Sequence, residues 1–244
     1  MRRRRVEANA LRTFVMVVVL SAVWLVRAQD SKPSYPSMAP TDQYLMVDRD
    51  AEIALARSAA PDAISHDAKV LVLGRRGFET AVEGKNGFVC VVERAWMSPV
   101  DSPEFWNPKL RGPICFNPAA ARSVLPFTYE RTDLALAGLS KTQMIARIKD
   151  ALTKKELPTL EPGALSYMMS KEQYLGDSIG HAVPHVMFYV PLTNGTDLGA
   201  DLPNSPIFMI PEFQGAPEPL TTFIVPVSNW SDGTSAVSEP VHNH

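Results

Sequence analysis

The residues best suited to chemistry gather between positions 176 and 187. Gly176-Asp177-Ser178-Ile179-Gly180 matches the G-x-S-x-G pattern that surrounds the nucleophile of many serine hydrolases. In those enzymes the serine stands on a sharp turn between a strand and a helix. Residues 171–175 instead favour a short helical turn, and Pro184 would end any helix that follows. A glycine-rich loop is therefore favoured over a catalytic Ser178.

Asp177, His181 and His185 follow one another at intervals of four residues. On a helix this spacing would place three ligands on one face, and a carboxylate with two neutral imidazoles suits zinc or iron. Gly180 and Pro184 disfavour such a helix. Two alternatives stay open: a loop in which His181 folds back toward His185, and a half-buried His185 that is bonded to the backbone.

Methionine thioethers offer a second kind of metal site, because they are soft ligands that suit copper together with imidazole. Ordinary core packing explains methionine equally well. The methionines on the expected C-terminal strands, which should lie near these histidines, are Met168, Met169, Met187 and Met209. Glu93 and Arg94, at the end of an apolar run, could contact a ligand, although an ion pair with each other is favoured.

The segment from His185 to Val190 alternates in a way that predicts a strand. Val186, Phe188 and Val190 would point to one side, which we expect to be core. His185, Met187 and Tyr189 would point to the other side, where they could line a binding pocket.

These side chains need a sheet to position them. The expected strands are 69–73, 78–83, 88–96, 164–169, 185–190, 206–210 and 220–227. Glycine-bounded turns at 74–77 and 84–87 predict that the first three strands form an antiparallel meander. The third strand opens with five consecutive apolar residues, which indicates burial on both faces. Pro226 places the last strand at an edge or a bulge.

Two or three helices are expected to pack on this sheet. They are 50–59, with Asp50 as N-cap, 127–137, and 141–155, where Ser140 and Gln143 form a capping box. Residues 97–118 contain five prolines and are expected to form a loop. Blocks of strands and helices predict an α+β fold with a largely antiparallel sheet.

The first 28 residues have the order of charges and apolar residues that is typical of a secretory signal peptide. Arg2–Arg5 precede an apolar stretch, and Val26-Arg27-Ala28 predicts cleavage near Ala28. An uncleaved anchor is the alternative, but a largely apolar stretch of 13 residues is shorter than the roughly 20 residues that a spanning helix needs. We expect an extended leader over 29–47, one domain over 48–233 and a disordered tail over 234–244.

Export also bears on the cysteines and on the charge. Cys90 and Cys115 form an even count, so a disulfide is expected, with two buried free thiols as the alternative. The net charge of −2 would become −7 after cleavage, with 18 Lys and Arg against 25 Asp and Glu. This balance disfavours nucleic acid and an anionic membrane surface as partners, and no stable membrane insertion is expected after cleavage.

Four segments together resemble an uncharacterised family of secreted bacterial proteins. They are EIALARSAAP (52–61), EGKNGFVCVVER (83–94), PGALSYMMS (162–170) and PHVMFYVPL (184–192). The resemblance implies a single domain in the periplasm or the medium, and it implies no activity.

Two functions follow from these observations. The favoured one is a non-enzymatic module that binds a small ligand or an envelope protein, with His185, Met187 and Tyr189 at the site. The alternative is a metal-dependent, hydrolase-like enzyme built on Asp177, His181 and His185.

Overall fold

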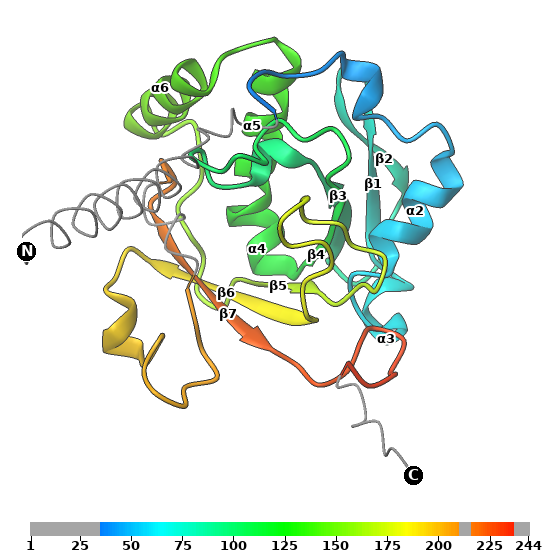
Figure 1. The fold of residues 1–244 in the computed structure, drawn as a ribbon, viewed down its shortest axis with the longest axis vertical. Coiled ribbons are helices and arrows are strands. Elements are labelled where there is room, and N and C mark those ends of the chain that lie inside the picture. Colours follow the sequence, from blue (N-terminus) through cyan, green and yellow to red (C-terminus); the bar gives the residue numbers. More distant parts are fainter. Residues whose placement is uncertain (1–34, 210–215, 237–244) are drawn as a thin grey trace, which may run out of the picture. The chain divides into compact units, whose positions relative to one another are not determined.

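A seven-stranded sheet in the order β2-β1-β3-β4-β5-β6-β7 forms the centre of the molecule (Figure 1). The computed structural model describes residues 35–209 and 216–236, which belong to one compact unit. The strands are β1 Lys69–Gly74, β2 Gly77–Val82, β3 Val89–Glu93, β4 Gly112–Phe116, β5 Leu165–Met168, β6 His185–Pro191 and β7 Leu220–Pro226. Only the pairing of β1 with β3 is parallel among these strands. The predicted α+β fold with a largely antiparallel sheet is therefore confirmed.

The predicted N-terminal meander is wrong in one respect. β1 and β2 form the expected hairpin, but β3 lies beside β1 rather than beside β2. The apolar run of β3 explains this placement, because an interior strand between β1 and β4 buries Cys90, Val91 and Val92 completely. β2 exposes Glu79 and Thr80 and stands at the edge. The expected edge position of the last strand is also confirmed, since β7 ends the sheet.

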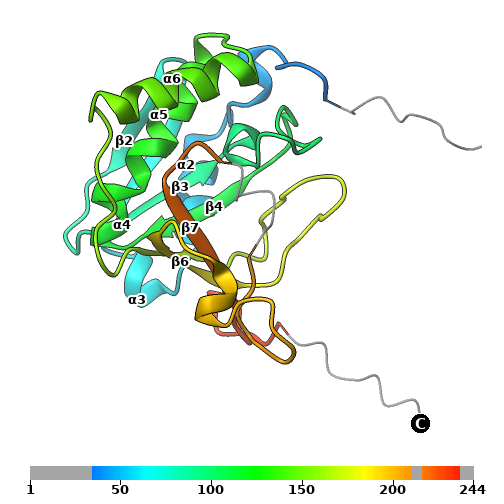
Figure 2. The same ribbon diagram turned by 90° about the vertical axis from the view of Figure 1, so that its left-hand side faces the viewer.

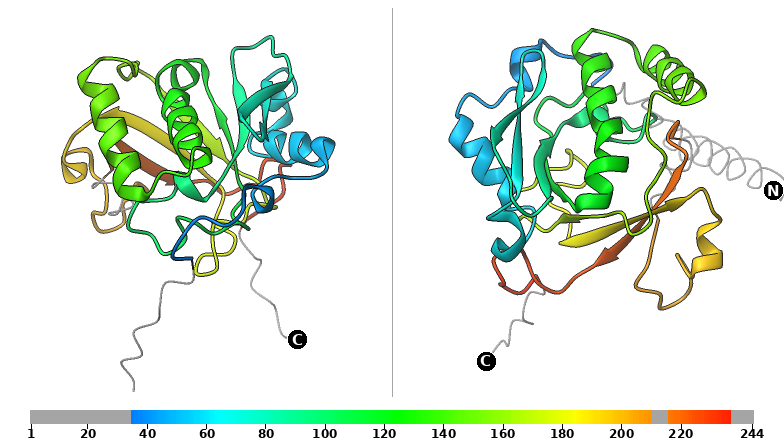
Figure 3. Two further views of the ribbon diagram at one scale, coloured as in Figure 1. Left: turned by 90° about the horizontal axis from the view of Figure 1, so that it is seen from above. Right: turned by 180° about the vertical axis from the view of Figure 1, so that it is seen from behind.

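Both faces of the sheet are covered, as Figures 2 and 3 show: α4, α5 and α6 lie on one side and α2 lies on the other. The helices are α2 Arg49–Arg57, α3 Asp62–Ser65, α4 Pro118–Ser123, α5 Leu125–Leu136 and α6 Lys141–Thr153. Short 3-10 helices are η1 Thr41–Gln43, η2 Ala95–Met97 and η3 Gly195–Leu198. No helix of the described segments is both long enough and apolar enough to cross a bilayer.

Alternation along the central strands produces two separate cores. Leu71, Val91 and Ile114 face α4 and α5, while Val70 and Val92 face α2. The same alternation separates Glu93 from Arg94, because neighbours on a strand point to opposite faces. The favoured ion pair between these two residues is therefore wrong.

Arg94 pairs instead with Glu52 of α2. Its Nη2 lies 2.7 Å from Glu52 Oε1, and its Nε donates to Tyr44 O at 2.7 Å. Arg94 is 0% exposed and Glu52 is 1% exposed. This buried pair fixes α2 and the segment before it on β3.

The predicted disulfide is present. Cys90 of β3 and Cys115 of β4 are direct cross-strand partners, and a disulfide joins them with both side chains fully buried beneath α2. The bridge therefore ties β3 to β4 within the sheet, three residues along each strand from the Glu93–Gly112 pair at which the proline-rich excursion leaves and re-enters it.

Several local boundaries differ from prediction. Asp48, not Asp50, caps α2, and its carboxylate accepts bonds from the backbone N–H groups of residues 50 and 51. The capping box of Ser140 and Gln143 is confirmed. The segment 97–118 is not a plain loop, because it contains β4. Pro113 is tolerated there because β5 pairs with β4 only at Cys115 and Phe116.

The ends of the described chain are better packed than expected. Tyr44, within the predicted extended leader, is 0% exposed, and its hydroxyl donates to Trp106 O at 2.8 Å. Ala236 donates its N–H to Ser228 O at 2.8 Å, so the predicted tail begins in ordered structure. Phe208 forms an isolated bridge with Ile224 rather than the expected strand. The predicted signal peptide, residues 29–34 and the tail beyond 236 lie outside the described residues.

Candidate binding site

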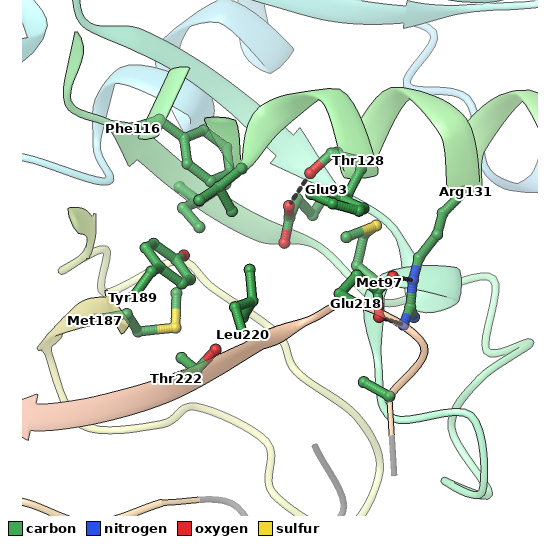
Figure 4. Close-up of a pocket in the computed structure, with 14 residues that line it drawn as sticks. Glu93, Met97, Phe116, Thr128, Arg131, Met187, Tyr189, Glu218, Leu220 and Thr222 are labelled. Carbon is green, nitrogen blue, oxygen red and sulfur yellow. Dashed lines mark hydrogen bonds and ion pairs between the residues drawn. The ribbon is translucent and has the colours of Figure 1, made fainter. Parts of the chain in front are cut away.

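A partly open cavity of about 100 Å³ lies between α5 and the sheet. Figure 4 shows Met187 and Tyr189 of β6 and Leu220 and Thr222 of β7 across the space from α5, with Glu93 of β3 beside Thr128 of α5. Its apolar lining comes mainly from Ile114, Phe116, Val124, Phe127, Met187 and Leu220. The strand residues arrive at the cavity because each strand sends every second side chain to the same face.

Glu93, the last residue of β3, brings a carboxyl group into this apolar space. Its Oε1 accepts a hydrogen bond of 2.9 Å from Thr128 Oγ1 of α5. Its Oε2 has no hydrogen-bond partner among the described residues. Burial raises the pKa of Glu93 to about 7, although the Thr128 hydrogen bond and the nearby charge of Arg131 both act to lower it.

Arg131, one turn further along α5, closes one end of the cavity with Glu218. Their contacts are bidentate, with 2.6 Å between Nε and Oε1 and 2.9 Å between Nη2 and Oε2. The remaining Nη1 donates to the carbonyl oxygens of Trp96 and Ser98 at 3.0 and 3.1 Å. Each of the three guanidinium nitrogens is therefore already engaged.

Tyr189 of β6 supplies a hydroxyl on the opposite wall. It shares a hydrogen bond of 2.7 Å with Ser166 Oγ of β5. Burial and the nearby Glu93 raise the pKa of Tyr189, so the phenol stays neutral around neutral pH.

Sequence reasoning placed His185, Met187 and Tyr189 together on one pocket-lining face. Met187 and Tyr189 do line the cavity, whereas His185 is not among its lining residues. His185 is 6% exposed, and its Nδ1 lies 2.8 Å from Val183 O. Desolvation lowers its pKa, so the neutral imidazole is favoured. This arrangement matches the backbone-bonded alternative.

The other face of β6 is not the closed core that we expected. Phe188 is 42% exposed, and Val186 and Val190 are only partly buried. The cavity and the adjoining core lie on the face of Met187 and Tyr189. Both faces of this strand carry apolar residues, so alternation could show that there were two faces but not which one was covered.

The predicted metal site of Asp177, His181 and His185 does not form. No three histidine, cysteine, aspartate or glutamate side chains gather for a metal ion within residues 35–209 and 216–236. Asp177 is held elsewhere, because it accepts hydrogen bonds from Tyr35 at 2.6 Å and from Tyr174. Gly176 and Gly180, both at positive φ, make this segment a turned loop rather than the helix that the spacing required.

Ser178 lies exposed in that loop. The strand before and the helix after a nucleophile elbow are missing from this part of the described chain, so the glycine-rich-loop alternative holds. Met168 and Met169 are 7% and 8% exposed, which fits their packing in the core.

Thr128, Arg131 and Glu218 were missed from sequence. The one signal available in the sequence was Glu93, a carboxylate at the end of an otherwise apolar strand, since an acid there needs a partner or an unusual pKa.

Comparison with models of known protein families, with curated protein sequences and with solved structures finds no significant match to this chain.

Proposed function

We propose that this chain is an exported, non-enzymatic protein that binds a small and largely apolar molecule in the cavity between α5 and the sheet. The observation that carries the proposal is an apolar cavity into which one carboxyl oxygen points without a partner. Ligand sites typically combine an apolar wall with a few such polar groups.

The size of the cavity limits the ligand. An apolar cavity of about 150 Å³ accommodates benzene, so the space of about 100 Å³ suits a ligand of roughly five non-hydrogen atoms, or the end of a longer chain that enters through the open side.

Binding is favoured over catalysis by the residue types in the wall. The lining residues include no histidine, cysteine, serine or lysine. The hydroxyl nearest a carboxyl group, on Thr128, is used to hold Glu93. A nucleophile paired with a base and oriented by a third group is the arrangement that covalent catalysis requires, and the lining residues do not supply it.

Export is supported by the order of charged and apolar residues in 1–28 and by a disulfide, which persists in oxidising compartments. We expect mass spectrometry of the native product to give a chain that begins at Gln29 and lacks two hydrogens because of the bridge. A chain that retains Met1 and has both thiols free would contradict export.

The ligand site is tested by methyl NMR of protein labelled at methionine. Met97 and Met187 line the cavity, whereas Met46 packs against the separate core on the α2 side of the sheet, which gives an internal control. We expect some members of a panel of small alcohols, amines, ketones and aromatics to shift the Met97 and Met187 signals and to leave Met46 unchanged. A panel in which no compound moves these two signals would contradict the proposal.

A further inference from the structure

We infer that the ligand carries a small alkyl ammonium group, which pairs with Oε2 of Glu93 while its apolar part packs against Phe116, Met187 and Leu220. This inference deepens the proposed function and rests on it. It states the chemical class of the ligand, a primary amine on a short apolar body.

The first argument is the balance of charges in the cavity wall. The lining residues include two carboxylates, Glu93 and Glu218, and one cation, Arg131. Arg131 binds both oxygens of Glu218 and directs its remaining nitrogen to backbone carbonyl oxygens. Glu93 is therefore the one acidic group of the cavity wall that lacks a direct cationic partner.

The second argument is geometric. Thr128 holds one oxygen of Glu93 at 2.9 Å and so fixes the orientation of the carboxylate. Figure 4 shows that carboxylate directed from β3 toward the space between Tyr189 and Leu220. A carboxylate whose orientation is already fixed loses little freedom on binding, and a hydrogen bond between two charged groups is stronger than one between neutral groups.

The protonation of Glu93 supports the same ligand class. Its pKa of about 7 means that the free protein contains both the neutral and the charged form near pH 7. The groups that face it are the Thr128 hydroxyl and the Arg131 guanidinium from α5, the neutral phenol of Tyr189 from β6, and Glu218, which Arg131 neutralises. An ammonium ligand would favour the charged form, whereas a ligand with only acceptor atoms would favour the protonated form.

The sign of the pH dependence follows from this difference. An amine with a pKa near 10 stays protonated throughout the range in which Glu93 titrates. Its affinity should therefore be low below pH 7 and rise by up to about tenfold per pH unit until Glu93 is ionised. A ketone that accepts a hydrogen bond from protonated Glu93 would show the opposite trend.

The test compares n-butylamine, 1-butanol and 2-butanone, which have the same number of non-hydrogen atoms. Each is titrated from about pH 5.5 to about pH 8.5 into full mature protein, and the Met97 and Met187 methyl signals report binding. We expect butylamine to bind at least about tenfold more tightly than butanol at the upper end, as a charged hydrogen bond implies. Glu93→Gln should remove both this preference and the pH dependence.

Glu79→Gln is the matched control, because Glu79 lies exposed on the edge strand β2 and should change neither result. Equal affinities for butylamine and butanol in the wild-type protein, or a preference for butanone that weakens as pH rises, would overturn the inference and leave the proposed function standing. If none of the three compounds shifts either methyl signal, both the inference and the ligand cavity are contradicted.

Discussion

Arg94→Met is expected to destabilise the protein by about 3 to 5 kcal/mol, because it would leave the carboxylate of Glu52 buried without its partner. Glu52 is 1% exposed and lies 2.7 Å from the guanidinium. The substitution also removes the donors to the backbone carbonyls of Tyr44 and Val92. Since domains of this kind are stable by roughly 5 to 15 kcal/mol, the loss is a large fraction of the total.

Denaturant unfolding measures this loss, and two comparisons make the result specific. Arg49→Met breaks an exposed ion pair with Glu79, in which the Arg49 side chain is 49% exposed and the Glu79 side chain is 60% exposed. That variant should lose no more than about 1 kcal/mol. The double variant Glu52→Met/Arg94→Met should lose less than the sum of the two single variants, because neither charge is then left alone. Similar losses for Arg94→Met and Arg49→Met would contradict the role of the buried pair.

The elements that sequence predicted well depend on neighbours along the chain. The capping box of Ser140 and Gln143 and the strands β5, β6 and β7 follow from local patterns of polarity and turn residues. The parallel pairing of β1 with β3 does not follow from such patterns, because it depends on which strand gains most from an interior position. Sequence therefore predicted the sheet type and most of the elements, but it missed β4 and α4, placed a strand over 206–210 where only an isolated bridge forms, and did not give the strand order.

The residues of the candidate site likewise include some that local sequence patterns predicted and others that they could not predict. Alternation along β6 correctly placed Met187 and Tyr189 on one face. The ion pair of Arg131 and Glu218 joins residues 87 positions apart, so no local pattern could indicate it. Regular spacing misled at Asp177, His181 and His185, because the glycines and Pro184 in that segment prevent the helix that would give the spacing its meaning.

The loss of ligand binding in Met187→Trp is the second large effect that we expect. Met187 lines the cavity, so an indole at this position would occupy most of its 100 Å³. Phe188 is the next residue of the same strand, and its side chain lies on the opposite face and is 42% exposed. Phe188→Trp is therefore a matched control, since both variants introduce the same side chain into β6.

Packing strain in Met187→Trp should cost about 1 to 3 kcal/mol, which thermal unfolding checks. If Met187→Trp is folded, a loss of ligand binding in this variant is not caused by unfolding. Because Met97 also lines the cavity, its methyl signal reports binding in both variants.

Titration of n-butylamine into wild type, Met187→Trp and Phe188→Trp, followed at the Met97 methyl group, tests the ligand cavity most directly. We predict saturable binding to the wild type and to Phe188→Trp with similar affinity, and a loss of at least about tenfold for Met187→Trp. Equal binding by all three proteins would place the ligand elsewhere and contradict the cavity between α5 and the sheet as the binding site.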